Sequence, residues 1–142
     1  MNTSLESSIG FKINTTANLL NSGFNQALQK HDIAIEQRAT LEIIQSEKNI
    51  TQTKIAQILG KDKTTISRTL KTLEKKALIK KEELDKRTYS IKLTNLGKRI
   101  LDDSYKTVKD FRKKIASNLS QEEINQLFTS LDKVLLTLSE KK

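Results

Sequence analysis

The chain has 142 residues, enough for one ordinary domain with a hydrophobic core and short for two. Its 26 basic and 17 acidic residues leave a net charge of +9, which favours an anionic partner, either nucleic acid or an acidic membrane surface. The absence of cysteine excludes disulfides and thiol-based oxidation switches, and no apolar run approaches the roughly 18 residues of a membrane span.

Composition also indicates the class of fold and a location. Proline is absent and the helix formers Leu, Lys, Glu, Gln and Ala recur throughout, so a mainly helical domain is expected. The N-terminus lacks the basic and apolar blocks of a signal peptide, and we therefore expect a cytoplasmic protein with no membrane partner.

The first predicted element is a helix from Ile9 to about Leu28, where apolar residues recur at steps of three and four. A loop is predicted at Lys30–Asp32, and it contains His31, the only histidine of the chain. One histidine cannot build a typical zinc site by itself, so no metal is expected. We interpret His31 as an ordinary loop or packing residue; a ligand contact or a pH-sensitive group is the alternative.

Two shorter helices are predicted next. The first covers about Ile35–Ser46, with Leu41 and Ile44 as its expected buried residues. The second begins after Thr51, a good N-cap, and ends at Gly60, as helices commonly end at glycine.

The following helix is the most informative element. Asp62 is well placed to cap it. Its apolar residues fall within a stripe of about 60°, and its hydroxyl and basic residues lie near the opposite pole. The stripe consists of Ile66, Leu70, Leu73 and Ala77, and the opposite face carries Thr64, Arg68, Lys71 and Lys75. Such a helix has one face for its own domain and one for a partner.

A two-stranded ribbon is predicted after this helix. Tyr89, Ile91 and Leu93 alternate with polar residues, which indicates a half-buried strand, and its partner is expected at about residues 79–84. Asp85 would repel phosphate if free, so we expect it to pair with and orient a nearby arginine. A plain Asp-Lys turn is the alternative.

Most of the basic excess lies in this part of the chain. Residues 61–92 hold 11 basic and 5 acidic residues, a net of +6 out of the total of +9. Solvated lysines explain many such clusters. The helix-turn-helix pattern in the same segment favours double-stranded DNA instead.

The C-terminal third is predicted to form two helices. Thr94 caps the first, which runs to about Ser117 and carries Leu101, Val108 and Ile115 at intervals of seven. The second spans about Gln121–Ser139 behind a capping box and is more apolar than a lone terminal helix should be. We expect these helices to make a homodimer, with packing of the last helix against the first as the alternative.

Together these elements predict a mainly α fold with a small β-wing, a winged helix-turn-helix embedded in a helical dimerisation frame. Residues 1–142 form one domain, with the DNA-binding region at 31–94 and the dimerisation region at 5–30 and 95–142.

Base contacts are predicted for Thr64, Thr65, Ser67 and Arg68, and phosphate contacts for Lys63, Lys71 and Lys75. Thr51, Gln52 and Lys54 on the preceding helix are further candidates, and Asp85, Lys86 and Arg87 form the wing tip, where arginine suits an A·T-rich minor groove.

The segments LGKDKTTISRTLKTLEKKALI and DKRTYSIKLTNLG resemble the MarR family of bacterial transcription regulators. The features that carry the resemblance are Leu59-Gly60, Thr65-Ile66-Ser67-Arg68, Leu73-Glu74, Asp85-x-Arg87 and Leu93-Thr94-x-x-Gly97. The resemblance implies a homodimer with interlocked terminal helices, Arg87 entering the minor groove, and Asp85 helping to hold it. Two departures are visible. Ala77 stands where the family usually has Gly, so the helix is expected to end differently there, and the segment before Asp85 is about two residues shorter.

The predicted function is a sequence-specific DNA-binding transcription regulator, a homodimeric repressor of a pseudo-palindromic operator that a small-molecule effector releases. The alternative is a winged-helix module whose basic face binds an acidic protein. No cofactor is expected, and no motif indicates an enzyme. Candidates for effector contacts are Phe24, His31, Arg38 and Tyr105.

Overall fold

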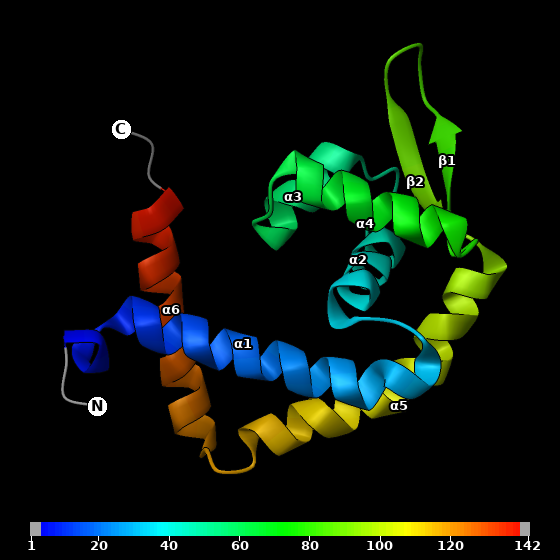
Figure 1. Ribbon diagram of the computed structural model, residues 1–142. Helices are drawn as coiled ribbons and strands as arrows, with labels where there is room; N and C mark the ends of the chain where they lie inside the picture. The colour runs from blue at the N-terminus through cyan, green and yellow to red at the C-terminus, as the bar shows by residue number, and fades with distance from the viewer. Residues whose placement is uncertain (1–3, 140–142) are drawn as a thin grey trace. The chain divides into compact units, whose positions relative to one another are not determined.

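The computed structural model describes residues 4–139, and the chain divides into two compact units, Met1–Val108 and Lys109–Lys142. The elements in chain order are η1 (Ser4–Ser7), α1 (Ile9–Leu28), η2 (Gln29–His31), α2 (Ile35–Ser46), α3 (Gln52–Leu59), α4 (Lys63–Lys75), β1 (Ile79–Glu83), β2 (Tyr89–Leu93), α5 (Asn95–Ala116) and α6 (Gln121–Ser139) (Figure 1). The predicted class, mainly helical with a two-stranded wing, is confirmed.

Local capping explains why α3 and α4 begin and end where they do. The Thr51 hydroxyl accepts the backbone N–H of Lys54 at 3.3 Å, and Gly60 closes α3 in the left-handed conformation with φ 64°. The Asp62 carboxylate accepts the N–H of Thr65 at 2.7 Å and starts α4. These contacts satisfy backbone groups that a helix end leaves unpaired, and they confirm the predicted caps.

One hydrophobic core lies beneath α4 and joins it to α2, α3 and the wing. Ile66, Leu70 and Leu73 are buried on α4, and they share the core with residues such as Leu41 and Ile55. Ala77, the fourth predicted member of the stripe, is exposed because it lies beyond the end of the helix.

The end of α4 corrects the expectation drawn from Ala77. The N–H of Ala77 bonds to the Glu74 carbonyl at 2.9 Å and that of Leu78 to the Leu73 carbonyl at 3.0 Å, the usual pattern at a glycine-terminated helix. Ala77 adopts the left-handed conformation with φ 62°. The helix therefore ends as it would with glycine, and Ala77 bears a conformational strain of about 1–2 kcal/mol.

The wing is an antiparallel hairpin in which Ile79 pairs with Leu93 and Glu83 with Tyr89. Its base is anchored because the N–H of Ile91 bonds to the Ile50 carbonyl at 2.9 Å, and Ile91 and Leu93 are buried. The predicted alternation is wrong at its outer end. Tyr89 is half exposed because it lies toward the free end of the hairpin, and Ser90 is fully buried.

Thr94 begins α5, as predicted, by accepting the N–H of Gly97 at 3.0 Å. The same hydroxyl donates to the Ala77 carbonyl at 2.6 Å. A Cβ on Gly97 would lie 2.2 Å from the Leu78 carbonyl oxygen, so only glycine permits this approach of α5 to the α4–β1 junction.

Two of the three interval-of-seven residues on α5, Leu101 and Val108, are buried within the first unit, together with Ser104. They therefore serve the core of their own chain. The third residue of the series, Ile115, is exposed.

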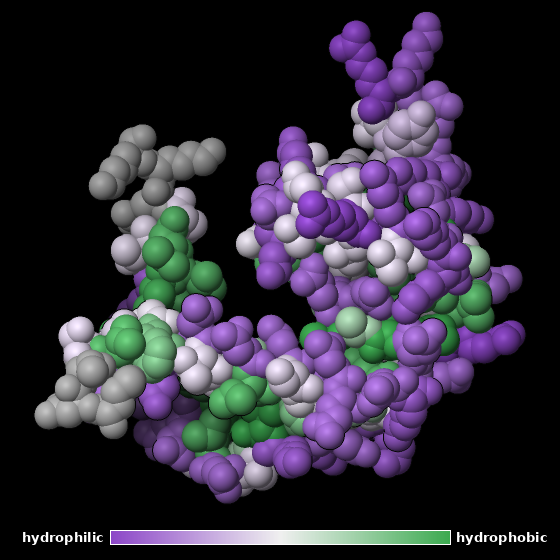
Figure 2. Space-filling view, viewed as in Figure 1, coloured by the Kyte–Doolittle hydropathy of each residue, from purple (hydrophilic) through white to green (hydrophobic). Residues whose placement is uncertain are grey.

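The second unit contains the end of α5 and all of α6. The predicted capping box is present, since Ser120 N–H donates to the Glu123 carboxylate at 2.9 Å and Glu123 N–H to the Ser120 hydroxyl at 3.1 Å. No described residue of α6 is buried. Figure 2 shows hydrophobic surface on its C-terminal part, and its large exposed apolar residues are Leu127, Phe128, Leu135, Leu136 and Leu138.

Between residues 4 and 139, no helix combines the length and the apolar character that crossing a membrane requires.

Candidate nucleic-acid interface

The polar face of α4 is open to solvent and rich in cations. Lys63, Thr64, Arg68, Lys71 and Lys75 are exposed, and Thr65 and Ser67 are partly exposed. Within residues 4–139 none of the four basic side chains on this helix forms an ion pair. The face thus presents hydroxyl and cationic donors that no described carboxylate engages in an ion pair, although the charge of Asp62 acts on Arg68.

The N-terminus of α4 is stabilised by a carboxylate that stays charged. The backbone N–H of Thr65, with further support from its side chain, the Thr64 N–H and the charge of Arg68, holds the pKa of Asp62 below its usual value. A negative charge at this end of the helix also interacts favourably with the helix dipole.

Polar contacts fix α4 against the preceding elements. The Thr69 hydroxyl donates to Glu36 on α2 at 3.2 Å, and the same carboxylate lies 4.0 Å from Lys61. Lys76 Nζ donates to the Asp32 carbonyl at 2.8 Å. These contacts tie the middle and the end of α4 to the start of α2, so its exposed face is held in a fixed orientation.

Gln52 has a role that the sequence did not indicate. Its side-chain N–H donates to the Lys63 carbonyl at 3.3 Å, which links the first turns of α3 and α4. Thr51 and Lys54 belong to the same turn of α3, where Lys54 is exposed and Thr51 partly exposed.

The wing tip is organised by Asp85, but not in the way predicted. Its Oδ1 accepts the backbone N–H groups of Arg87 at 2.8 Å and Thr88 at 2.9 Å, and within the described residues it forms no ion pair with the Arg87 guanidinium. These two N–H groups, Arg87 first, hold the pKa of Asp85 below its usual value. The short side chain of aspartate readily accepts hydrogen bonds from backbone N–H groups two and three residues further along the chain. An ion pair with Arg87 would instead require its long, flexible side chain to fold back.

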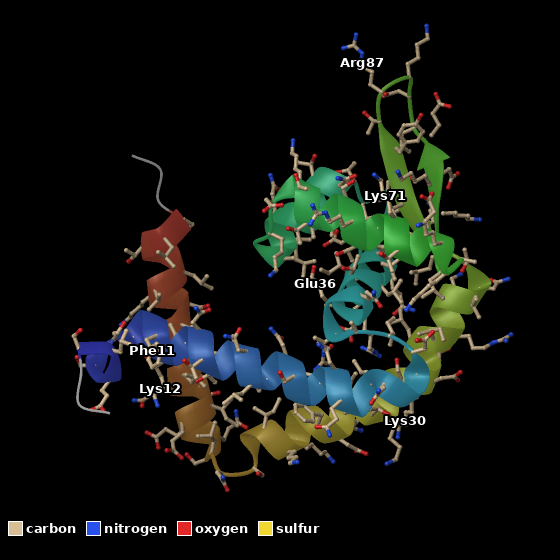
Figure 3. All side chains as sticks on the ribbon, viewed as in Figure 1. Phe11, Lys12, Lys30, Glu36, Lys71 and Arg87 are labelled. Atoms are coloured by element: carbon tan, nitrogen blue, oxygen red, sulfur yellow. The ribbon has the colours of Figure 1, made fainter. Side chains whose placement is uncertain are left out.

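Lys86 and Arg87 are exposed at this tip. Figure 3 shows Arg87 at the free end of the wing, pointing away from the helices, and Lys71 on α4. The arginine predicted to probe a groove of DNA is therefore presented on a turn that is itself hydrogen bonded.

A groove of about 370 Å³ lies between the start of α3 and the wing. It brings Thr51 and Gln52 close to Arg87, three residues predicted separately from the sequence. Thr53, Lys81 and Tyr89 also line it, with Thr88 and Ile91, and no carboxylate does. Thr53, Lys81 and Tyr89 were not predicted as site residues, because their place in this groove depends on how the hairpin lies beside α3, which no local pattern indicates.

The candidates for effector contacts are distributed over several elements of the first unit. Phe24 packs against the core, and Tyr105 is exposed. His31 Nε2 lies 2.9 Å from the Thr107 hydroxyl. Arg38 is buried, with its polar groups bonded to Ser104, Leu101 and Glu42. Contact of these four residues with an effector stays a prediction.

No group of three or more His, Cys, Asp or Glu side chains placed to hold a metal ion occurs among residues 4–139.

The fold and this surface define a winged helix-turn-helix protein. Residues 31–88 match the family model described as "MarR family". The HTH-type transcriptional regulator MgrA of Staphylococcus aureus is 31% identical over 122 residues, covering 83% of this chain and 80% of MgrA. The chain belongs to the MarR family of transcriptional regulators.

Two solved structures extend this similarity over almost the whole chain. A MarR/EmrR family transcriptional regulator from Acinetobacter sp. ADP1 superposes with a TM-score of 0.91 at 29% identity and covers 98% of this chain and 100% of its own. MepR of S. aureus, solved in complex with DNA, has a TM-score of 0.84 at 26% identity, with 94% and 99% covered. The chain is accordingly a DNA-binding transcription regulator of the winged-helix type.

Proposed function

We propose that this regulator is a homodimeric repressor that reads a pseudo-palindromic operator with one α4 helix in each of two major grooves. The observation that carries the proposal is the polar face of α4, whose exposed hydroxyl and basic side chains are free of ion pairs among the described residues. An α-helix fits the major groove, where such donors can meet base edges.

The residues of this face are assigned to two kinds of contact with DNA. Thr64, Thr65, Ser67 and Arg68 lie in the first half of α4, the part that usually faces the bases. Arg68 is the candidate for reading guanine, because its guanidinium can donate to both O6 and N7. Lys63, Lys71 and Lys75 are assigned to phosphates, which fix register without reading sequence.

The wing and α3 supply contacts on either side of the reading helix. Arg87, presented at the wing tip, is proposed to enter the minor groove, with Lys86 beside it on the backbone. The groove free of carboxylates between α3 and the wing is proposed to accommodate the DNA strand, with Thr51 and Gln52 on one wall and Lys54 on the same turn.

A dimer is supported by the apolar side chains that α6 leaves exposed in the described chain. Five large hydrophobic residues are exposed on this one helix, and exposed apolar side chains gathered on one element are typical of a protein–protein interface. A two-fold protein also explains how two α4 helices reach half-sites separated by about one DNA turn, some 34 Å. By its family membership the repressor is further proposed to release its operator when a small aromatic or amphipathic molecule binds near Phe24, His31, Arg38 or Tyr105.

The test begins with selection of duplexes from a random pool, followed by anisotropy titrations at several salt concentrations. The proposal predicts one preferred, two-fold symmetric sequence and a salt slope of roughly −9 for about ten neutralised phosphates per dimer. Salt-dependent binding without any preferred sequence would contradict a specific reader. No DNA binding at all would favour the alternative, a basic winged-helix module for an acidic protein.

A further inference from the structure

Arg38 is an unusual residue for the interior of the DNA-reading region. It is the fourth residue of α2 and is 3% exposed, although arginine is seldom buried without a specific set of partners. Neither the proposed base contacts nor the wing uses it.

The partners of Arg38 lie mainly on α5. Its Nε donates to the Ser104 hydroxyl at 2.7 Å, and its Nη2 donates to the Leu101 carbonyl at 3.0 Å. Nη1 forms an ion pair with Glu42, one turn further along α2. The guanidinium therefore binds both a side chain and the main chain of α5, and all of these atoms belong to the first unit.

Ser104 completes the contact from the other side. It is fully buried, and its hydroxyl donates to the Ile100 carbonyl at 2.6 Å while it accepts from Arg38. One turn further on, Thr107 lies 2.9 Å from His31 Nε2, which is in the segment leading into α2. Hydrogen bonds on successive turns of α5 thus fix its direction as well as its position.

The direction of α5 matters because the helix is long. It continues from Ser104 to Ala116, about 18 Å at 1.5 Å per residue. A change of about 10° at Ser104 moves Ala116 by about 3 Å, close to the rise of one base pair. In a dimer that reads two half-sites, a displacement of this size would change their separation by about one base pair.

We propose that Arg38 is a positioning residue for operator recognition, whose buried contacts with Ser104 and Leu101 set the direction in which α5 leaves the DNA-reading region. That direction determines the half-site separation that the dimer accepts. The inference rests on the proposed function, since it requires a dimer that reads two half-sites.

This role differs from a general contribution to stability. The ion-pair partner of Arg38, Glu42, has a side chain that is 38% exposed, so replacing the arginine leaves no buried carboxylate without a counter-charge. A polar set of fixed geometry can in addition specify one arrangement among several. Arg38→Met is therefore expected to fold and to lose spacing discrimination.

The first experiment uses operators made from the selected half-site at the preferred spacing and at spacings one base pair longer and shorter. The parent protein is expected to favour one spacing by about tenfold or more. Arg38→Met and Ser104→Ala should reduce this preference to less than about threefold, with affinity for a duplex containing a single half-site within about twofold of the parent. Ser117→Ala is the matched control, because among residues 4–139 its exposed hydroxyl bonds only to the Lys114 carbonyl of its own segment.

The second experiment measures the same property without DNA. The chain has no cysteine, so Gln57→Cys on the exposed side of α3 carries one spin label per protomer. In the parent the distance between the two labels should show one narrow distribution. Arg38→Met should shift or broaden it by about 3 Å or more, the displacement expected from the length of α5.

The possible results separate the two claims. A parent that prefers no sequence and no spacing overturns the proposed function and this inference with it. The inference alone is overturned if the parent prefers one spacing and both variants behave like it. In that case Arg38→Met and Ser104→Ala keep the full spacing preference and the parent's distribution of label distances. If Arg38→Met does not fold, Ser104→Ala decides the question by the same readouts, because it removes the acceptor of Arg38 Nε and a bond within α5 but keeps the arginine and its bond to the Leu101 carbonyl.

Discussion

The Asp85 carboxylate accepts the backbone N–H of Arg87 at 2.8 Å, so it holds the main chain of the wing tip and leaves the guanidinium free to extend. Asp85→Ala removes this bond and the one from Thr88 at 2.9 Å. We expect the loosened tip to weaken operator binding about fivefold to tenfold, most on A·T-rich flanks, as Arg87→Ala should. Asp85→Asn keeps the acceptor and removes a negative charge near phosphate, so it should bind at least as tightly as the parent in an anisotropy titration. Equal weakening by the Asn and Ala variants would contradict the turn-holding role.

The cap of α4 makes a prediction about pH. Hydrogen bonds from Thr65 lower the folded-state pKa of Asp62 from its ordinary value of 3.8. Because the pKa is lower in the folded protein, the ionised cap contributes its full stabilisation at pH values above the unfolded-state pKa of 3.8. This stabilisation is lost as the pH falls below 3.8 and through the lower folded-state pKa. In urea titrations, the difference in unfolding free energy between parent and Asp62→Ala should therefore shrink across that range. A difference that stays the same from about pH 6 down to the lowest pH at which both proteins fold would rule out the charged cap.

The strain at Ala77 predicts a stabilising substitution. Ala77→Gly relieves a left-handed conformation with φ 62° and should raise the unfolding free energy by about 0.5–1 kcal/mol, since glycine's greater freedom in the unfolded chain offsets part of the gain. The thermal midpoint should rise by a few degrees. Ala17→Gly, within α1, is the matched control and should lower stability by about 1 kcal/mol. A loss of stability in both variants would show that Ala77 is not strained.

At Gly97, by contrast, replacing glycine with alanine is expected to destabilise the protein. A Cβ at this residue would lie 2.2 Å from the Leu78 carbonyl oxygen, and backbone cannot give way as a side chain can. Gly97→Ala should therefore destabilise the protein by about 1–3 kcal/mol in chemical denaturation. Gly10→Ala in α1 meets only the Ser8 hydroxyl at 3.8 Å and should be neutral or slightly stabilising. The close packing of α5 on the α4–β1 junction is contradicted if the two variants behave alike.

The local part of this architecture was predictable from the sequence. The caps at Thr51, Asp62 and Ser120 and the glycine after α3 act within a few residues, so the helix bounds follow from spacing and residue type alone. The exposed cations of α4 were predictable for the same reason, because helical periodicity assigns them to one face.

The features that the sequence did not predict depend on bonds between distant segments. The conformation of Ala77 is imposed by the bonds that end α4 and by Thr94, 17 residues away. The burial of Arg38 requires Ser104, 66 residues away. Lys81 and Tyr89 enter the site only because the hairpin lies beside α3. None of these relationships has a local signature.

The central claim is that α4 reads sequence with Arg68 and holds phosphate with Lys71, and binding of the selected operator and of a scrambled duplex tests it most directly. Arg68→Ala should weaken operator binding by about 1–3 kcal/mol and leave scrambled-duplex binding almost unchanged, so that specificity falls. Lys71→Ala should weaken both by a similar factor and reduce the salt slope by about one for each phosphate that is no longer neutralised. If Arg68→Ala and Lys71→Ala lower affinity for the two duplexes equally, or bind both like the parent, α4 does not read the operator in the proposed way.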